Sequence, residues 1–277
     1  MAKKQEKKEE VVSQVPAPTA GTGVVPSYGE FAGQGNEDMA LLQTRPPILN
    51  LLQALSPEVQ EGTEDYVKGA RPGLFLNTAT KALVTSVRGV IVALLRKYVQ
   101  WEKAEPGQQG KFVAAHDPED PMVVAAVAKA AKTKERWKVY APNGDDLVET
   151  YTICLLQLDE NDQPIGPVIL SASKTKIKPI SEFRARISAL PGSSKIPIYA
   201  HRIVLQAARV KKSDKISYHN IQIVPAGEDV VSSLLPADSP VVVLAAEMRK
   251  QALQMKVEPV SDAPTERADA PAADNVF

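Results

Sequence analysis

The chain has 277 residues, enough for one large domain or two small ones, and its 33 basic and 33 acidic residues cancel to a net charge of zero. This balance excludes a uniformly basic or acidic protein, so a charged partner would be recognised only by local concentrations of charge. The lone cysteine, Cys154, excludes an internal disulfide and indicates a reducing compartment. The polar first ten residues do not resemble a signal peptide, and the most apolar window, Leu83 to Val99, is interrupted by three basic residues. We therefore expect a soluble, cytoplasmic protein.

Both ends of the chain have the composition of disordered segments. Residues 1–45 join a mixed run of Lys and Glu to a stretch rich in Pro, Gly and Gln, whereas residues 257–277 are mainly Pro, Ala and acid. Neither segment offers enough apolar surface to offset the entropy lost on ordering. We predict a disordered N-terminal arm, one folded β-rich domain over residues 46–256 and an acidic disordered tail.

The first half of the folded domain has the less regular patterns. Residues 47–55 are a short apolar segment that fits one or two helical turns, and residues 73–77 predict a strand followed by a turn. Residues 84–101 are rich in β-branched side chains and predict one or two strands, with a helix as the alternative. Asp120 and the proline after it provide an N-cap and a first-turn residue for an Ala-rich helix over residues 121–136.

The second half predicts two hairpins with a helix between them. The first hairpin has strands at residues 150–158 and 167–173, joined by a turn at residues 161–166. The second has strands at residues 198–210 and 216–224, joined by a turn at residues 211–215. A short helix is expected at residues 180–187, and Ser239-Pro240 opens a last helix with an apolar stripe through Val241 and Met248. Because no strand–helix alternation is present, the pattern predicts a mainly β or α+β fold, and an antiparallel barrel like the oligonucleotide-binding (OB) fold is the leading candidate.

Positive charge is concentrated in one segment of this domain. From Ser171 to His219, eleven basic residues face only Glu182 and Asp214, which gives a net charge of +9. Aromatic residues are interleaved with these cations, and single-stranded nucleic acid requires this combination, because cations follow the phosphates and flat side chains stack on the bases. The predicted nucleic-acid-binding residues are Lys174, Lys176, Lys178, Phe183, Arg184, Arg186, Tyr199, Arg202, Arg209, Lys211, Lys212 and Tyr218.

Further observations bear on this prediction. If residues 174–178 are extended, their three lysines share one face of a strand. Trp101 and Trp137 are additional candidates for stacking. The alternative is a solvated surface on which lysines protect strand ends from edge pairing, with the tyrosines as core or cross-strand partners.

The acidic tail opposes this basic segment and ends in an aromatic residue. Five acidic residues after position 257 face only Arg267, for a net charge of −4, and the chain closes with Asp274, Asn275, Val276 and Phe277. In this the sequence resembles bacterial and bacteriophage single-stranded DNA-binding proteins, in which an acidic tail with a terminal aromatic residue follows an OB barrel. The resemblance implies that Asp274 and Phe277 dock replication or recombination proteins, and that the tail competes with DNA for the basic surface.

A second resemblance covers more of the chain. The stretches Gly73–Thr78, Tyr98–Trp101 and Val113–Asp117 are similar to uncharacterised bacteriophage proteins. This implies a phage source, and hence the cytoplasm of a bacterial host, without fixing an activity.

Motifs for catalysis and cofactors are missing from the sequence. Neither a phosphate-binding Gly-x-x-x-x-Gly-Lys-Ser/Thr nor a Gly-x-Gly-x-x-Gly after a strand occurs, and the three histidines are scattered. The cluster His116-Asp117-Pro118-Glu119-Asp120 fits a divalent ion in a nuclease, but Asp117 and Asp120 also fit caps of the following helix. We expect no enzyme, no cofactor and no metal site.

The leading hypothesis is a phage-type single-stranded DNA-binding protein of replication or recombination, without a preference between DNA and RNA fixed by the sequence. It acts through a basic β-hairpin surface and can be a homo-oligomer. The alternatives are a virion structural or assembly protein, and an enzyme, either a nuclease or a strand-annealing recombinase.

Overall fold

A computed structural model describes residues 46–103, 110–133, 138–192, 196–211, 213 and 217–254. All of these residues belong to one compact unit, Met39–Phe277. The predicted arm at residues 1–45 and the predicted tail at residues 257–277 lie outside the described residues.

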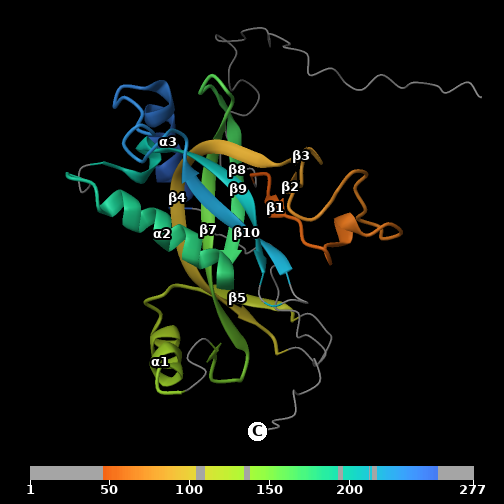
Figure 1. The fold of residues 1–277 in the computed structure, drawn as a ribbon. Coiled ribbons are helices and arrows are strands. Elements are labelled where there is room, and N and C mark those ends of the chain that lie inside the picture. Colours follow the sequence, from red (N-terminus) through yellow and green to blue (C-terminus); the bar gives the residue numbers. More distant parts are fainter. Residues whose placement is uncertain are drawn as a thin grey trace, which may run out of the picture. The chain divides into compact units, whose positions relative to one another are not determined.

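Two long antiparallel strands form the centre of the main sheet (Figure 1). Strands β4 (Ser86–Trp101) and β7 (Asp146–Leu158) pair along most of their length. At the first half of β4 the sheet is widened by β9 (Arg202–Lys211) and β10 (Ser217–Pro225), and β8 (Pro164–Ser173) pairs with the other side of β7. This half therefore has the strand order β10-β9-β4-β7-β8, with every pair antiparallel.

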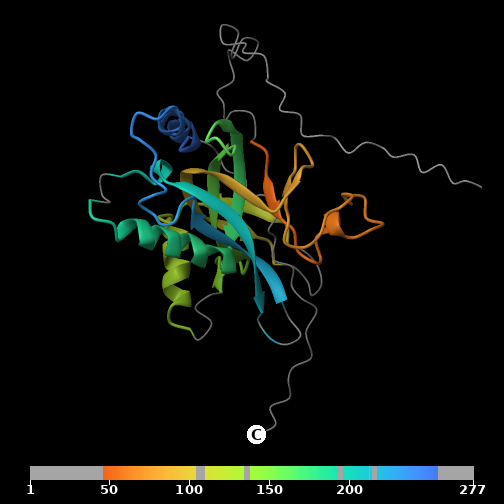
Figure 2. The ribbon, with the colours of Figure 1, turned by 45° about the horizontal axis from the view of Figure 1, so that its top comes forward.

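The other half of the central strand pair has shorter neighbours. Strand β5 (Phe112–His116) pairs with the last residues of β4, and β6 (Val139–Tyr140) pairs with the first residues of β7. Helix α1 (Pro121–Ala130) packs beside them. Asp120 caps α1 by accepting a hydrogen bond from the amide of Met122 at 2.8 Å, as its sequence predicts. Figures 1 and 2 show α1 and α3 (Pro240–Ala252) at opposite ends of the central pair.

A separate three-stranded sheet lies beside the main one. Its strands are β1 (Leu49–Leu51), β2 (Phe75–Asn77) and β3 (Leu83–Val84). It meets β8 through one parallel bridge between Ile48 and Ile169. Among the described strands no ladder joins β8 to β10, so the antiparallel β-architecture with helices is confirmed and closure into a barrel is not.

Short helices complete the chain. Helix α2 (Ile177–Ser188) connects β8 to β9. The connections among the described residues include the 3₁₀ turns η2 (Pro57–Val59), η3 (Lys174–Lys176) and η5 (Ile198–Ala200). None of the described helices is long and apolar enough to span a bilayer.

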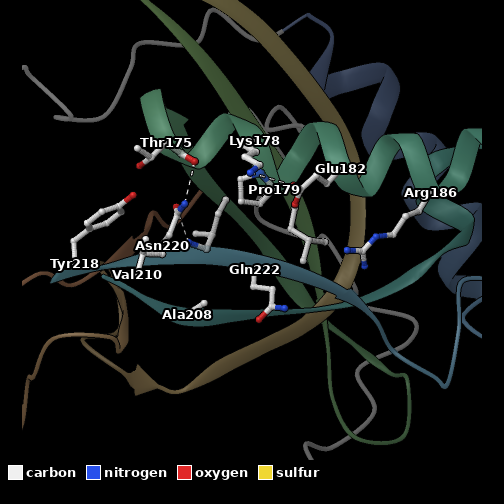
Figure 3. A pocket seen from close by; sticks show the side chains of 12 residues that line it. Thr175, Lys178, Pro179, Glu182, Arg186, Ala208, Val210, Tyr218, Asn220 and Gln222 are labelled. Atoms are coloured by element: carbon white, nitrogen blue, oxygen red, sulfur yellow. Dashed lines mark hydrogen bonds and ion pairs between the residues drawn. The ribbon is translucent and has the colours of Figure 1, made fainter. Parts of the chain in front are cut away.

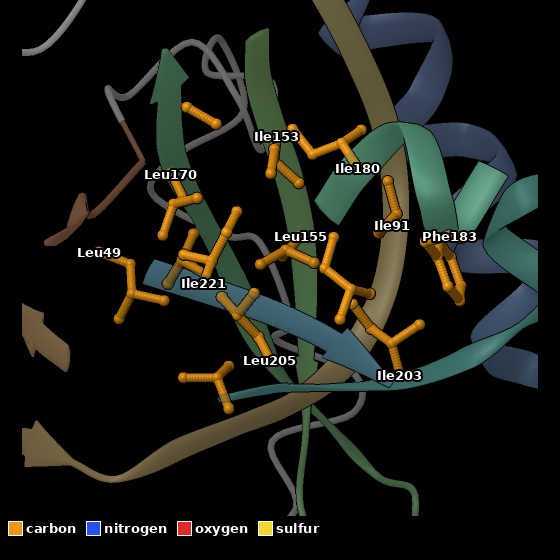
Figure 4. Close-up of a cluster of buried hydrophobic side chains, with 14 of the residues drawn as sticks. Leu49, Ile91, Ile153, Leu155, Leu170, Ile180, Phe183, Ile203, Leu205 and Ile221 are labelled. Carbon is orange, nitrogen blue, oxygen red and sulfur yellow. The ribbon is translucent and has the colours of Figure 1, made fainter. Parts of the chain in front are cut away.

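Strand β4 contributes side chains to two cores, and a bulge changes which of its residues face each core. The register with β7 shifts between Ile91 and Ala93. Ile91 belongs to the largest core, under β9, β10 and α2 (Figure 4), whereas Val92 and Ala93 face the core that α3 covers. The bulge adds a residue to one strand only, so it changes which side chains of β4 point to each face.

Most elements agree with the sequence predictions, although residues 47–55 and 174–178 differ from the conformations considered for them and α1 ends at Ala130 rather than near residue 136. The strands at residues 150–158 and 167–173, the second hairpin and the helix at Pro240 are confirmed, and residues 84–101 are strand rather than helix. Residues 47–55 contain strand β1 instead of helical turns. Residues 174–178 are not extended either: η3 and the start of α2 occupy them, and Lys174 has a φ of 52°. Lys174, Lys176 and Lys178 therefore do not share the face of a strand.

Candidate nucleic-acid interface

A groove with a volume of about 380 Å³ lies between α2 and the β9–β10 hairpin (Figure 3). One wall is a flank of α2, and the other is the edge strand β10 together with Ala208 and Val210 of β9. Of the predicted binding residues, Lys178, Arg186 and Tyr218 line this groove.

The apolar face of α2 fixes the orientation of the helix. Ile180, Phe183 and Ile187, spaced three and four residues apart, are 1%, 1% and 7% exposed and belong to the largest core (Figure 4). The burial of Phe183 contradicts the expectation that its ring stacks on a base.

The flank of α2 next to this face supplies the charged wall of the groove. Lys178, Glu182 and Arg186 follow one another at intervals of four residues and all line it. Lys178 and Glu182 form an ion pair of 3.7 Å, with side chains 81% and 52% exposed. Such an exposed pair contributes little to stability, so Lys178 can exchange its carboxylate partner for a phosphate at small cost. At 100° per residue, Arg184 points to the other flank of α2, away from the groove.

The hairpin wall carries polar side chains on alternate positions. Tyr218, Asn220 and Gln222 pair across the hairpin with Val210, Ala208 and Gln206, and directly opposed residues lie on the same face of a sheet. The intervening residues, Ile221 and Ile223, also line the groove, but they are only 1% and 4% exposed and belong to the core.

Hydrogen bonds fix this wall against the start of α2. The amide Nδ2 of Asn220 donates to the carbonyl oxygen of Thr175 at 3.0 Å, and its Oδ1 accepts the N–H of Ile221 at 2.9 Å. Nε2 of Gln206 donates to Oε1 of Gln222 at 3.0 Å. The groove is thus formed by the fold before any ligand binds. Tyr218, half-buried, contributes its ring to this wall.

Further cations lie on the elements that border the groove. Lys174 and Lys176 are in η3, immediately before α2, and Arg209 and Lys211 are at the end of β9. Arg209 is exposed and donates from Nη2 to the hydroxyl of Ser217 at 3.1 Å, across the hairpin.

Two predicted residues do not line this groove. Tyr199, in η5, packs against the core that α3 covers. Arg202 is at the opposite end of β9 from Lys211, about 30 Å from that lysine along the strand at roughly 3.3 Å per residue. Its guanidinium is engaged by Asp162 at 2.6 Å and by the carbonyl oxygen of Ser232 at 3.0 Å. Arg202 therefore has a structural role, and the expected continuous basic surface does not include it.

His201, in the basic segment, is also held by the fold. His201 is fully buried, and its Nδ1 lies 3.3 Å from the carbonyl oxygen of Val230 and from the hydroxyl of Ser233. Burial lowers the pKa of His201, and the hydrogen bond with Val230 offsets this only in part. His201 is therefore unsuited to contact a phosphate.

The cluster at residues 116–120 does not gather into a metal site. Nε2 of His116 lies 2.8 Å from Oε1 of Gln100, Asp117 forms an ion pair of 2.6 Å with Lys97, and Asp120 caps α1. No group of three or more His, Cys, Asp or Glu side chains in the described part of the chain is arranged to hold a metal ion.

Other predicted residues cannot be placed. Lys212, Trp137, Asp274 and Phe277 lie outside the described residues. Trp101 is 5% exposed and packs edge to face against Phe112, with ring centroids 6.0 Å apart.

The sequence prediction missed the polar wall of the groove. Asn220 and Gln222 alternate with isoleucines in β10, which is the signal that a strand has one buried and one accessible face. The alternation in β10 could therefore have indicated this wall from the sequence. Glu182 and Thr175 line the groove only because α2 lies against β10, and no local sequence pattern predicts that packing.

The comparisons with known proteins give one family. A family model described as Pam3 phage gp34-like protein matches residues 19–248, more than four fifths of the chain. The matched region includes every residue of the groove and ends before the acidic tail. No curated protein and no solved structure gives a significant match.

Proposed function

The chain belongs to the family of Pam3 phage gp34-like proteins, and from this premise we propose that it is a single-stranded DNA-binding protein that supports phage replication or recombination. The observation that carries the proposal is the groove between α2 and the β9–β10 hairpin. It combines two cations, Lys178 and Arg186, with the accessible ring of Tyr218 and the amides of Asn220 and Gln222.

The chemistry of these walls suits an unpaired strand. Lys178 and Arg186 lie eight residues apart on α2, about 12 Å at 1.5 Å per residue, so each can neutralise a different phosphate. A tyrosine ring is a stacking platform that accepts any base, and stacking is worth roughly 1–3 kcal/mol per base. Duplex DNA hides its base faces, so a stacking groove favours single strands.

The order of the strands supports the same proposal. In sequence, β4, β7 and β8 are followed by α2 and then by the β9–β10 hairpin, all around one core. We assign this arrangement to an OB-like fold, which is a five-stranded, partly open Greek-key barrel. In OB folds the loop between the fourth and fifth strands contributes to ligand binding. Here those strands are β9 and β10, whose ends carry Arg209 and Lys211 and whose faces form the groove wall.

A fluorescence anisotropy titration of the full chain with labelled oligo(dT), over a series of salt concentrations, tests the proposal. We expect saturable binding at low salt that weakens steeply as salt is added. In the variant Lys178→Ala/Arg186→Ala, the slope of log K against log salt should fall by about 1.4, since each lost phosphate contact on a single strand removes roughly 0.7.

Lys129→Ala is the matched control, because Lys129 is an exposed cation on α1, remote from the groove. It should leave both affinity and salt slope unchanged. Absence of saturable binding at low salt, or equal slopes for the double variant and the control, would overturn the proposal. The same titration with oligo(rU) measures the preference between DNA and RNA.

A further inference from the structure

The groove between α2 and the β9–β10 hairpin carries one acidic side chain among its described lining residues, that of Glu182. Lys178 and Arg186 lie about one helical turn before and after it (Figure 3). A carboxylate repels a phosphate, so at this position it weakens the attraction of the groove for a nucleic-acid backbone. The ion pair with Lys178 does not explain the presence of Glu182, because both side chains are exposed and such a pair adds little to stability.

The hydrogen-bonding capacity of this carboxylate is unused within the described part of the chain. Its two oxygens offer about four acceptor positions. The ion pair with Nζ of Lys178 is 3.7 Å long, which is beyond hydrogen-bond distance. Once Lys178 turns to a phosphate, both oxygens of Glu182 are free to accept hydrogen bonds from a group that enters the groove.

The opposite wall presents a donor. Gln222 of β10 is exposed and lines the groove (Figure 3). Its Oε1 accepts a hydrogen bond from Nε2 of Gln206 at 3.0 Å, so its own Nε2 is available to donate. The groove therefore offers a pair of acceptors on α2 and a donor on β10, and the apolar side chains of Ile221 and Ile223 also line it.

These groups match the edge of one base. Bases of a single strand are recognised by hydrogen bonds to their Watson–Crick edges. Guanine carries two adjacent donors there, N1–H and the N2 amino group, which donate in parallel to two carboxylate oxygens, and its O6 beside them is an acceptor. Adenine and cytosine place a ring-nitrogen acceptor next to their single amino group, and thymine places N3–H between two carbonyl oxygens. Each of these three bases thus turns an acceptor toward the carboxylate, which repels it.

We propose that Glu182 selects guanine in single-stranded DNA. Its carboxylate accepts hydrogen bonds from N1–H and the N2 amino group, Nε2 of Gln222 donates to O6, and the two cations of α2 bind the neighbouring phosphates. The inference rests on the proposed function, to which it adds a base preference that stacking and phosphate contacts do not provide. The selected base is not the one that stacks on Tyr218, since Tyr218 and Gln222 are four residues apart on β10, about 13 Å at roughly 3.3 Å per residue.

Anisotropy titrations of the full chain test the preference with four labelled strands. These are oligo(dT) and the same strand with dG, deoxyinosine or dC at regular, isolated positions. Deoxyinosine keeps N1–H and O6 but lacks the N2 amino group, so it removes one of the two hydrogen bonds to Glu182. We expect the dG strand to bind roughly 5- to 150-fold more tightly than oligo(dT), the deoxyinosine strand to lie between them, and the dC strand to bind more weakly than the dG strand.

Glu182→Gln assigns the preference to the carboxylate. This variant should bind the dG and deoxyinosine strands equally, and it should bind oligo(dT) at least as tightly as the wild type does, because a negative charge leaves the groove. A structural role for Glu182 would instead weaken binding to all four strands. Glu247→Gln is the matched control, since Glu247 forms an exposed ion pair of 2.8 Å with Lys250 on α3 and does not line the groove. It should keep the wild-type preference.

Gln222→Leu tests the donor on the other wall. Both purines carry O6, so this variant should bind the dG and deoxyinosine strands more weakly by the same factor and leave oligo(dT) binding nearly unchanged. A larger loss for one purine strand than for the other would contradict the contact with O6. Circular dichroism of each variant shows that it is folded.

The outcomes separate this inference from the proposed function. If none of the four strands binds saturably at low salt, both are overturned. If all four bind with equal affinity, single-strand binding stands and the selection of guanine is overturned. A preference for dG over deoxyinosine that persists in Glu182→Gln also overturns it, because another group would then recognise the base.

Discussion

The side-chain amide of Gln53 pairs with both main-chain polar groups of His219: its Nε2 donates to the carbonyl oxygen at 2.8 Å, and its Oε1 accepts the N–H at 3.0 Å. Gln53 thus acts on the edge of β10 as one residue of a further strand would. Gly73 lies beside the same histidine, where a Cβ would come within 2.9 Å of the imidazole, and its φ of 89° also favours glycine. The segment after β1 is thereby fastened to the strand that forms the groove wall.

Gln53→Ala should lower the free energy of unfolding by about 1–2 kcal/mol, because two partly buried main-chain groups lose their partners. Urea denaturation measures this difference. Gln60→Ala, which truncates an exposed glutamine, is the control and should change stability by less than about 0.5 kcal/mol. Equal effects of the two substitutions would contradict the role assigned to Gln53.

Asp162 should make part of the free energy of unfolding depend on pH. Burial raises the pKa of this carboxyl, but hydrogen bonds from Arg88 and Arg202 outweigh burial and leave the pKa below its usual value. A lowered pKa in the folded state stabilises the protein above the unfolded-state pKa, near 4, and this stabilisation is lost as pH falls through the folded-state value.

Asp162→Asn should therefore lower stability by about 1–2 kcal/mol at pH 7 and by progressively less below about pH 4. Asparagine tolerates the left-handed φ of 60° at this turn, so the backbone is preserved. Urea denaturation of both proteins from neutral to acid pH isolates the contribution of Asp162 as their difference. A difference that does not change with pH would be inconsistent with this assignment.

Tyr218 should act through its ring rather than its hydroxyl. Tyr218→Ala is expected to weaken oligo(dT) binding by roughly 1–3 kcal/mol, about 5- to 150-fold, whereas Tyr218→Phe should bind nearly as the wild type does. Anisotropy at constant salt measures both. Equal losses in the two variants would instead indicate a hydrogen bond from the hydroxyl.

Phe183 should behave as a core residue. Phe183→Ala is expected to lower the free energy of unfolding by about 3–5 kcal/mol, while Phe183→Leu, which keeps most of the apolar volume, should cost less and remain folded. Folded Phe183→Leu should bind oligo(dT) with wild-type affinity. Weaker binding by this folded variant would indicate that the ring of Phe183 stacks on a base.

Local patterns predicted the second half of the fold well, and for identifiable reasons. Two hairpins with turn residues at 161–166 and 211–215, and a helix opening at Ser239-Pro240, depend on short-range signals that are read directly from sequence. Which face of the sheet each β4 residue occupies was harder to predict. The bulge after Ile91 shifts the alternation of side chains between the two faces, and no residue type in the sequence indicates the bulge.

The candidate site was predictable in part. The mixture of cations and aromatics makes Lys178, Arg186 and Tyr218 candidates, and the structure brings these three to one groove. Phe183 was assigned to the surface although Ile180, Phe183 and Ile187 repeat at helical spacing, a pattern that indicates burial. The position of Arg202 depends on its pairing with Asp162, forty residues earlier in the chain, which no local pattern reveals.

Cys154 gives the molecule an internal reporter of its own opening. The thiol lies in the core that α3 covers, and burial raises its pKa to about 11. At pH 8 only about one thiol in a thousand would be ionised even if a reagent reached it, so the closed protein is almost inert to alkylation. The rate at which a thiol reagent labels the native chain therefore measures how often the layer formed by α3 lifts from the sheet, without any introduced probe.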